Sequence, residues 1–422
     1  MSLRPLTIAF SALRHRNFRL LWLGQIISTS GSMMQTAAVL WHISLLVPGG
    51  PKEKGLALGL VGLVKFVPIV VFSLLSGVVA DALDRRKLML ATESGLALVA
   101  VALAWLTFRG VEATWPIYVL TGLSSVFSSF NGPARQSLIP ALVPAREFPN
   151  AITLNTIMFH AASIVGPALA GIVIASLGIG WAYALNAASF LAVIYALVAM
   201  DRIPERDLGL RTDISLRAAV EGLRFVFQSP MIRSTMLLDF FATFFSSATA
   251  LLPIFAQDIL HVGAREWGWM SAAPAVGALV AAAIMLPLAD RIVNRGKTFI
   301  VAVVLYGLAT IAFGLSRSFA LTLVCLAITG AADTVSMVLR NIIRQLSTPD
   351  HLRGRMTSVN MIFFMGGPQL GELEAGVVTR FFGATVAVVT GGIGCLVATA
   401  AIVAKTPEVW RYKREERTSE AA

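Results

Sequence analysis

The sequence predicts an all-α membrane protein with twelve transmembrane helices, arranged as two similar six-helix bundles. Three observations carry this prediction: the composition, a series of long apolar segments and an internal repeat. Of the 422 residues, 56% are hydrophobic and only 14% are charged, whereas about a quarter of the residues of a typical soluble domain are charged. Most of the chain is therefore expected to lie in lipid.

The apolar segments are long enough to cross the hydrocarbon layer as helices, which takes about 20 residues. Lipid admits only helices and closed barrels, because backbone polar groups must find partners within the protein. In chain order the predicted helices span residues 18–46, 56–80, 88–108, 115–140, 149–177, 180–200, 231–260, 267–289, 298–316, 319–346, 355–382 and 384–404. The first is too long for a signal peptide and other spans follow it, so it is expected to be retained.

One long charged connection divides the helices into two sets. Residues 201–230 separate an N-terminal bundle, residues 1–200, from a C-terminal bundle, residues 231–404, and a polar tail follows at 405–422. Apolar residues of the connection recur at helical spacing: Leu216, Val220, Leu223 and Phe227. This spacing predicts an amphipathic helix that lies on the membrane surface and tethers the bundles.

The distribution of basic residues predicts the orientation, since cytoplasmic loops collect Lys and Arg. With both termini inside, the inner loops, tails and adjoining helix ends hold 27 of the 34 Lys and Arg residues, and the outer loops hold six. The net charge of +11 is thus read as a topology signal and not as a nucleic-acid-binding surface. No nucleic-acid partner is expected.

Few residues of the sequence suggest enzyme or metal chemistry. Both cysteines, Cys325 and Cys395, fall inside apolar helices and have no metal-site spacing. The five histidines are scattered along the chain: His15, His42, His160, His261 and His351. Since an intramembrane enzyme needs a clustered nucleophile, base or metal ligand set, we expect no enzyme activity, no metal and no cofactor.

An internal repeat relates the two halves at an offset of 205 residues. Five identical pairs match at this offset: Arg135 and Arg340, Pro144 and Pro349, Asn155 and Asn360, Gly166 and Gly371, Gly171 and Gly376. The offset aligns the fourth helix with the tenth and the fifth with the eleventh. Repeated bundles of this kind are typical of transporters that move one half against the other around a central site.

Polar residues follow one face of four predicted helices, where a polar stripe indicates a cavity or a helix contact. The first helix has Gln25, Ser28, Ser32 and Gln35, and the fourth has Ser124, Ser128, Asn131 and Arg135. The seventh has Asp239, Thr243, Ser246, Pro253 and Gln257, and the tenth has Thr329, Asp333, Ser336 and Arg340. Close packing is the more ordinary explanation of a single Ser, but it does not require Gln or Asp, so the four stripes together predict a substrate pathway.

Several ionisable residues within the spans are candidates for coupling and gating. Asp333 is the leading candidate for carrying a proton, because the membrane interior favours the neutral form of a carboxyl group; a static pair with a basic residue is the alternative. Lys65 is predicted to pair with Glu372 or Glu374 and close an extracellular gate, and the two glutamates are also candidates for carrying a proton. His160 is a further proton-relay candidate, with packing as the more ordinary role.

The loop after the second predicted helix reads Gly77-Val-Val-Ala-Asp81-Ala-Leu-Asp84-Arg85-Arg86-Lys87. It resembles the loop signature of the major facilitator superfamily, with Ala82 in place of the usual basic residue and Asp84 in place of the usual Gly. Asp81 is expected to meet the positive N-terminus of a neighbouring helix and close a cytoplasmic gate, with Arg85 and Arg86 beside it. A plain positive-inside loop is the alternative.

The fifth helix contains Gly166-Pro167 and Gly171, which resemble the glycine-proline signature of the superfamily's antiporters. A helical Pro removes a backbone hydrogen bond and small neighbours allow close approach, so this segment is expected to bend at an interface between the halves. The Arg-rich stretch from Arg340 to Arg355 is similar to the loop before the eleventh helix in one branch of that superfamily, and Arg135 and Arg340 are predicted gating residues.

Over residues 18–405 the sequence resembles the branch of the superfamily that contains the enterobactin exporter and the macrolide efflux proteins. The resemblance implies the major facilitator fold and proton-coupled export of a small amphipathic molecule, such as a drug or siderophore, by alternating access. It further implies a monomer in contact with lipid in the bacterial inner membrane, with both termini in the cytoplasm. A lipid or lysophospholipid flippase, or an importer of the same fold, is the alternative.

Overall fold

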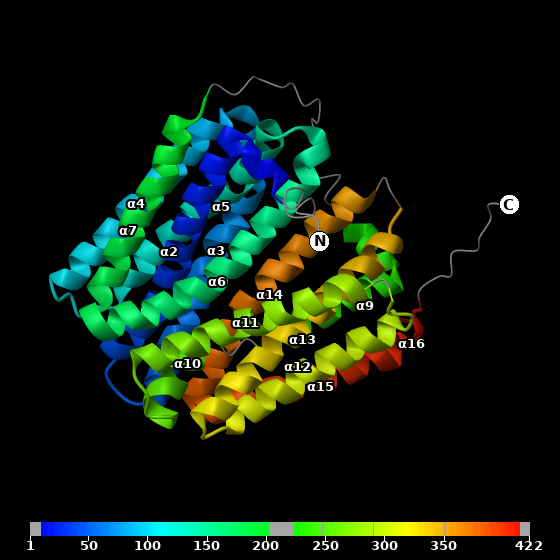
Figure 1. The fold of residues 1–422 in the computed structure, drawn as a ribbon. Coiled ribbons are helices and arrows are strands. Elements are labelled where there is room, and N and C mark those ends of the chain that lie inside the picture. Colours follow the sequence, from blue (N-terminus) through cyan, green and yellow to red (C-terminus); the bar gives the residue numbers. More distant parts are fainter. Residues whose placement is uncertain (1–9, 202–222, 247–248, 290, 350–351, 414–422) are drawn as a thin grey trace, which may run out of the picture. The chain divides into compact units, whose positions relative to one another are not determined.

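The structure, a computed structural model, describes residues 10–201, 223–246, 249–289, 291–349 and 352–413. Within these ranges twelve helices have 17 or more residues (Figure 1), which confirms the predicted all-α class. Nine helical segments in the described ranges are long and apolar enough to cross a membrane. Leu216 and Val220 of the predicted amphipathic helix lie outside the described residues.

The helices group into two compact units. Unit 1 comprises Met1–Thr212 and Leu252–Ala272, and unit 2 comprises Asp213–Leu251 and Ala273–Ala422. The sequence places residues 252–272 in the C-terminal bundle, whereas the structure packs this segment with the N-terminal helices.

Twelve long helices build the two units. Those that lie entirely in unit 1 are α2 (Arg16–Leu46), α3 (Pro51–Ala82), α4 (Arg85–Phe108), α5 (Trp115–Leu142), α6 (Phe148–Leu177) and α7 (Ile179–Ala199). The others are α9 (Pro230–Ser246), α11 (Ala264–Leu288), α12 (Arg295–Leu315), α13 (Phe319–Leu346), α14 (Arg353–Phe382) and α15 (Ala384–Lys405). Of these, only α11 begins in unit 1 and continues into unit 2.

Each unit packs its helices in the same pattern. In unit 1, α2 lies against α6 and α7, α4 lies against α5 and α7, and α3 lies against α5. In unit 2, α9 lies against α14 and α15, and α12 lies against α13 and α15, while glycines bring α11 against α13. Two turns mark the same repeat: Gly178 (φ +94°) ends α6 and Gly383 (φ +92°), 205 residues later, ends α14.

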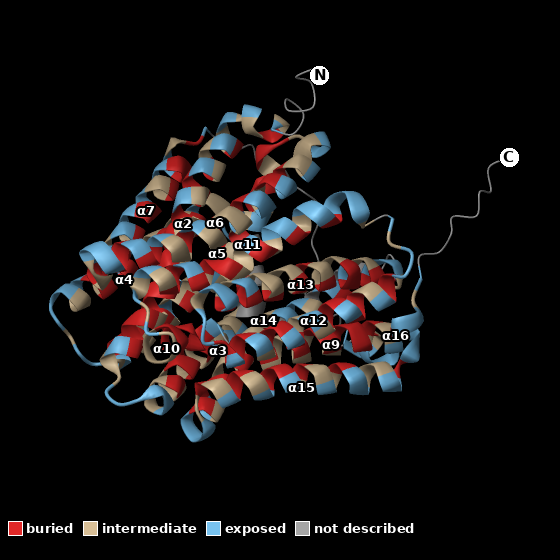
Figure 2. Cartoon of the chain, turned by 60° about the horizontal axis from the view of Figure 1, so that its bottom comes forward, coloured by how far each residue is buried: buried red, intermediate tan, exposed pale blue. Residues whose placement is uncertain are grey.

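Burial follows the helix faces within each unit. Figure 2 shows buried residues on the inner faces of the helices and exposed residues on their outer faces. Phe18, Met89 and Leu154 belong to the buried cluster of unit 1, and Phe299 and Leu339 to that of unit 2. Many exposed residues are large and apolar, such as Leu191 (62% exposed) and Val397 (62%). Exposed apolar surface of this kind suits contact with lipid.

One predicted helix start differs from the structure by more than three residues, and one predicted helix is not α-helical throughout. Helix α3 begins at Pro51 and not at residue 56, because Glu53 accepts a hydrogen bond from the Gly50 backbone N–H (3.1 Å) and caps a polar first turn that hydropathy alone does not detect. The predicted helix 231–260 corresponds to one segment that is long and apolar enough to cross a membrane, Pro230–Ile259, and α9 (Pro230–Ser246) is its first part. A 3₁₀ turn, the short α10 (Leu252–Ile254) and a π-helical turn, η4 (Phe255–Ile259), follow.

Glycines allow the close approach of α11 and α13, and this gives a stability prediction. A Cβ at Gly330 would overlap the carbonyl group of Pro274, and one at Gly277 would overlap that of Ala327. We expect Gly330→Ala and Gly277→Ala each to lower the free energy of unfolding by about 1–3 kcal/mol. The matched control is Gly132→Ala in α5, where a Cβ meets nothing within 4 Å. Unfolding in mixed SDS micelles measures the difference, and equal behaviour of Gly330→Ala and the control would contradict it.

Candidate functional site

Unit 1 contains a buried polar network centred on Glu93 of α4. Glu93 is 2% exposed. Its carboxylate accepts hydrogen bonds from Gln25 Nε2 (3.0 Å) and Asn131 Nδ2 (3.0 Å), and Ser28 Oγ lies 3.5 Å away. The network therefore joins α2, α4 and α5 around one carboxylate.

Arg135 extends this network toward the surface of unit 1. Its Nη1 donates to Gln25 Oε1 (3.2 Å), so that Gln25 bridges Arg135 and Glu93. Asn131 also donates to Thr92 Oγ1 (3.1 Å). The structure thus brings together the predicted residues Gln25, Ser28 and Asn131 with Arg135.

The sequence did not single out Glu93 as a site residue, because α4 corresponds to a peripheral helix in the resembled family. Its position in the sequence could have marked Glu93 as a buried carboxylate, because it lies eight residues after Arg85, where α4 begins, and so well away from the basic loop. A carboxylate at that depth needs donors from neighbouring helices, and the polar stripes of α2 and α5 provide them.

Unit 2 contains a buried charge cluster, the triad of Asp239, Arg340 and Asp333. Arg340 Nη2 lies 2.8 Å from Asp239 Oδ1, and both side chains are almost fully buried, at 2% and 1% exposed. Arg340 Nη1 lies 3.4 Å from Asp333 Oδ1 and donates to Ser336 Oγ (3.0 Å). One arginine thus serves two carboxylates, and the triad with both carboxylates ionised carries one surplus negative charge.

Asp333 borders a small pocket in unit 2. The pocket has a volume of about 130 Å³ and brings five hydroxyl-bearing residues near Asp333: Ser246, Thr249, Tyr306, Thr310 and Thr329. The Asp333 side chain is 40% exposed. Since a water molecule occupies about 30 Å³ of liquid, the pocket has room for a few waters around this carboxylate. The surplus negative charge of the triad therefore lies at Asp333, the carboxylate that water can reach.

Arg344, one turn beyond Arg340, fills the neighbouring space in unit 2. It is 2% exposed, it hydrogen-bonds Asn360, and its Nη2 donates to Asn341 Oδ1 (2.7 Å).

A larger pocket lies between α5 and α6 of unit 1. It has a volume of about 480 Å³, and its lining includes Arg135, Asn155, Ile152, Phe148 and Phe159. The described lining residues contain one cation, Arg135, and no carboxylate. His160, the neighbour of Phe159 in the chain, does not line it; its ring lies 6.2 Å from that of Phe159.

The remaining polar stripe residues of unit 1 lie as follows. Gln35 Oε1 accepts from Asn186 Nδ2 (2.8 Å) on α7, Ser32 and Ser124 are half-buried, and Ser128 is exposed. In unit 2, Thr243 Oγ1 donates to the Asp239 carbonyl (2.8 Å). These residues thus take up different environments, and their assignment to a substrate pathway stays a prediction.

The residues of the two predicted gates lie on α3 and α14. Lys65 is half-buried in α3 of unit 1, while Glu372 and Glu374 are half-buried in α14 of unit 2. Gly77 and Asp81 lie in α3, but the Asp81 side chain is outside the described part. The pairings predicted for Lys65 and for Asp81 therefore stay predictions.

The basic residues after α3 cap helix ends. Asp84 Oδ1 accepts from the Arg86 backbone N–H (2.9 Å) and begins α4. Arg85 Nη1 donates to the Ser137 carbonyl and Arg86 Nη2 to the Val198 carbonyl, each at 3.1 Å. Cations near the last turn of a helix satisfy its carbonyl groups, so this loop holds the ends of α5 and α7.

The glycines of α6 mark two close helix contacts within unit 1. A Cβ at Gly166 would lie 2.8 Å from the Ser30 carbonyl oxygen of α2, and one at Gly171 would lie 2.8 Å from the Cα of Gly268 at the start of α11. The Pro167 carbonyl oxygen lies at the same crossing, 2.9 Å from the position of a Gly268 Cβ. The glycine-proline segment thus contacts both a first-half helix and the segment 252–272.

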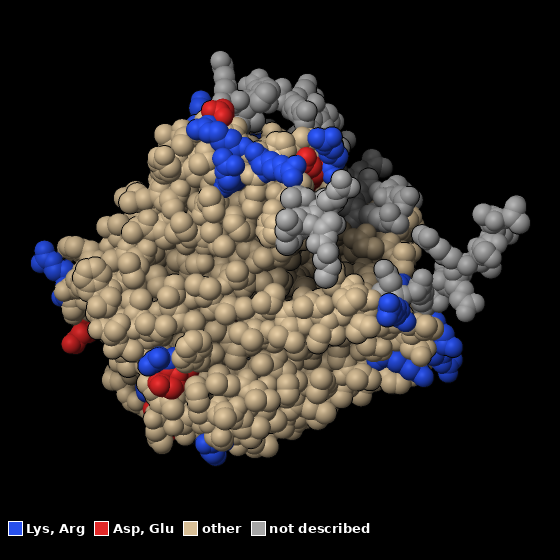
Figure 3. Space-filling view, viewed as in Figure 1, with Lys and Arg blue, Asp and Glu red and all other residues tan. Residues whose placement is uncertain are grey.

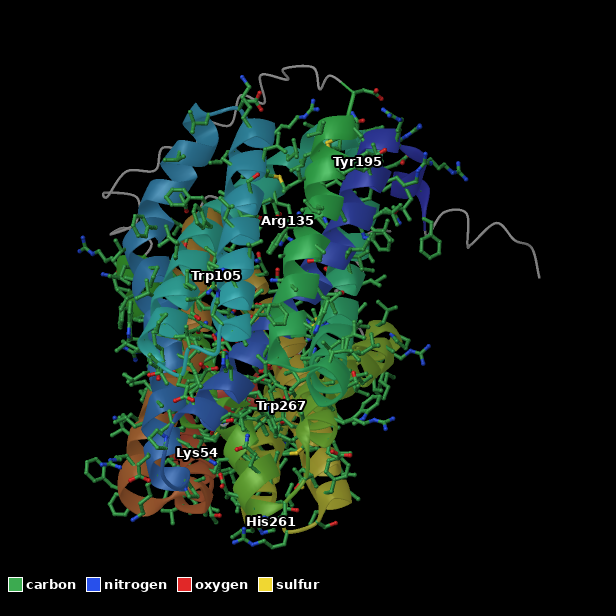
Figure 4. The ribbon with its side chains drawn as sticks, turned by 90° about the vertical axis from the view of Figure 1, so that its left-hand side faces the viewer. Lys54, Trp105, Arg135, Tyr195, His261 and Trp267 are labelled. Carbon is green, nitrogen blue, oxygen red and sulfur yellow. The ribbon has the colours of Figure 1, made fainter. Side chains whose placement is uncertain are left out.

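A polar cluster ties this segment to the starts and ends of other helices of unit 1. Lys54 Nζ lies 3.1 Å from Asp258 Oδ2 and donates to Gln257 Oε1 (3.2 Å), and Gln257 Nε2 donates to Ser44 Oγ (2.8 Å). The rings of Trp41 and Trp267 lie 5.0 Å apart. In Figure 4, Lys54 and His261 lie at the end of unit 1 opposite Tyr195. These contacts were not predicted, because the sequence assigns the segment to the other bundle.

Two repeated six-helix sets with charged networks buried inside them define a polytopic helical transporter. A family model described as transmembrane secretion effector matches residues 7–420, and the chain belongs to this family of the major facilitator superfamily. Its family and relatives are transporters and not enzymes.

Relatives and solved structures agree with this assignment. The chain is 29% identical over 321 residues to the multidrug efflux pump Tap of Mycolicibacterium fortuitum, covering 74% of this chain and 77% of that protein. It is 25% identical over 400 residues to the enterobactin exporter EntS of Citrobacter koseri, covering 95% and 94%. A D-xylose-proton symporter structure superposes with a TM-score of 0.73 at 12% identity, covering 93% of this chain and 98% of that one, which supports the fold.

Proposed function

We propose that this protein is a secondary active exporter that moves a small amphipathic molecule, a drug or siderophore, out of the bacterial cytoplasm in exchange for protons by alternating access. Its relatives include a multidrug efflux pump and enterobactin exporters, which supports export. The surplus carboxylate of the Asp239–Arg340–Asp333 triad carries the proposal of proton coupling. The protein acts as a monomer surrounded by lipid.

The proposed orientation places both termini in the cytoplasm of a cell whose inner membrane holds the protein. In the view of Figure 3, Lys and Arg side chains gather at helix ends and the sides of the helices are free of charge. Most of the basic residues belong to the loops and tails on the side of the termini, which the positive-inside rule assigns to the cytoplasm. The cluster of Lys54 and Asp258 then lies at the extracellular end of unit 1.

In the proposed coupling step, Asp333 takes up a proton from the hydroxyl-lined pocket. A charge buried in a membrane protein is costly unless it is paired, and Arg340 is already paired with Asp239 at 2.8 Å. Protonation of Asp333 removes its charge from beside Arg340, which keeps its pair with Asp239, whereas deprotonation restores a second carboxylate that Arg340 and the nearby buried Arg344 offset. Substrate movement and proton movement are thus linked through one carboxylate.

Transport by purified protein in liposomes with an imposed pH gradient tests this proposal. We expect the gradient to drive movement of at least one compound from a panel of antibiotics, siderophores and lipids, and pyranine trapped in the liposomes to report proton movement in the opposite direction. Asp333→Asn, which fixes the triad in its neutral form, is expected to reduce gradient-driven transport to the level of empty liposomes. Exchange of labelled for unlabelled substrate without a gradient should continue.

The matched control removes a carboxylate elsewhere. Glu408→Gln, an exposed residue of α16 (Pro407–Arg411), should leave both measurements unchanged. Gradient-driven transport that survives Asp333→Asn would reject this residue as the coupling site. Movement of lipids alone would favour the flippase alternative.

A further inference from the structure

The 480 Å³ pocket of unit 1 lies where, at the equivalent position of the repeat, the side chain of Arg344 fills unit 2. At the 205-residue offset, Gln136 corresponds to Asn341, Ile139 to Arg344 and Asn155 to Asn360. In unit 2 the buried Arg344 reaches across to Asn341 and Asn360. In unit 1 the shorter, apolar Ile139 cannot do so, and a pocket lies between α5 and α6 at that place.

The same comparison shows a difference between the two repeated arginines. Arg340 is 2% exposed and pairs with two carboxylates. Arg135 is half-buried and lines the pocket, and its hydrogen bond to Gln25 uses Nη1. Glu93, which offsets its charge, is itself covered by Gln25, Asn131 and Ser28. A guanidinium group has five N–H donors, so Arg135, which lines the pocket, has donors beyond the one that binds Gln25.

The remaining lining defines the rest of the ligand. Phe148 and Phe159 supply aromatic rings, Ile152 supplies aliphatic surface, and Asn155 and Gln136 supply amide groups. Aromatic and aliphatic walls favour a flat apolar body. The volume lies within the range of about 300–1,000 Å³ that is usual for pockets of drug-sized ligands.

We infer that this pocket, the Arg135 pocket, binds the transported molecule, and that this molecule is an amphipathic anion with a ring-bearing body. Its anionic oxygen group accepts hydrogen bonds from Arg135, and its rings lie against the apolar lining that Phe148, Ile152 and Phe159 supply. That the bound molecule is the transported one rests on the proposed export function, whereas binding to the pocket does not depend on that function. The pocket exists because position 139 holds Ile where the repeat has Arg.

Two xanthene dyes of opposite charge test the inference by direct binding. Fluorescein is an anion and rhodamine 6G is a cation, and both carry the same three-ring core. Fluorescence anisotropy with protein in lipid nanodiscs, corrected with empty nanodiscs, gives the Kd of each dye. We expect fluorescein to bind about tenfold or more tightly than rhodamine 6G, as a charge-assisted contact with one arginine provides.

Matched variants locate the binding site. Ile152→Trp fills the pocket and should weaken fluorescein binding about tenfold or more. Ile157→Trp is its control, since Ile157 lies on the same helix with a similar exposed fraction (50% against 48%) and does not line the pocket. Arg135→Gln should abolish the preference for the anion, and Arg135→Lys, which keeps the charge, should retain it. Thermal unfolding of each variant shows that it is folded.

The outcomes separate this inference from the proposed function. Failure of fluorescein to bind more tightly than rhodamine 6G, or equal effects of the two Trp substitutions, overturns the Arg135 pocket as a site for an amphipathic anion. The expected binding pattern without any gradient-driven transport supports the pocket and rejects the export function. If the gradient drives transport but Ile152→Trp does not weaken fluorescein binding, the export function is supported and the Arg135 pocket is rejected as the binding site.

Discussion

Arg340→Met is expected to destabilise the protein by about 3–5 kcal/mol, because it leaves Asp239 as an uncompensated buried charge. Asp239 is 1% exposed, and Arg340 is the only described residue that forms an ion pair with it. Asp239→Leu should cost less, since Arg340 then still has Asp333 at 3.4 Å. The free energy of unfolding, measured by steric trapping in lipid bicelles, gives both values.

The double variant Asp239→Leu with Arg340→Met supplies the internal control. Replacing both members of a buried ion pair by apolar residues of similar size is often neutral, so the double variant should lie within about 1 kcal/mol of the parent. The two substitutions are thus expected to be strongly non-additive. Additive losses in this cycle would mean that the pair does not act as a unit. Arg317→Met, at an exposed position, should change stability by no more than about 0.5 kcal/mol.

Composition, hydropathy and the repeat predicted the helical framework, because a helix in lipid must bury every backbone polar group and so needs a long apolar run. α2 ends at Leu46 and α13 spans Phe319–Leu346, in agreement with the predicted ends. The start of α3 was missed because its first turn is polar. The 3₁₀ turn at Thr249–Leu251 and the π-helical turn at Phe255–Ile259 were missed because hydropathy does not distinguish α-helical from 3₁₀ or π-helical turns.

The candidate site could be predicted only in part. The stripes of α2, α5 and α13 identified Gln25, Asn131 and Arg340, since polar residues at helical spacing must share a face. Which carboxylate each arginine meets depends on the neighbouring helix, and single-helix periodicity does not contain that information. The repeat indicates the contacting helix but not the contacting group: Arg340 pairs with Asp239 of α9, whereas Arg135 hydrogen-bonds Gln25 of the equivalent helix α2 and meets Glu93 through it.

The two units thus use different means to hold the same repeated arginine. In unit 2 an ion pair at 2.8 Å fixes Arg340. In unit 1 the charges are joined through the Gln25 amide, and Glu93 is stabilised by neutral donors from α2 and α5. A network of neutral donors around one carboxylate is weaker per contact but leaves Arg135 able to bind a further anion. This difference makes Glu93 the residue on which the polar interior of unit 1 depends.

Glu93→Leu is therefore expected to lower the free energy of unfolding by about 3 kcal/mol, because Gln25 and Asn131 lose their shared acceptor and Arg135 loses the charge that offsets its own. Glu93→Gln keeps one carbonyl oxygen as acceptor for both amides and should cost less than half as much. Steric trapping in bicelles measures both, with Glu112→Leu at an exposed position of the same unit as a control that stays within about 0.5 kcal/mol. If Glu93→Leu were as mild as Glu112→Leu, the carboxylate would not organise α2, α4 and α5, and the assignment of Arg135 as an anion-binding residue would lose its structural basis.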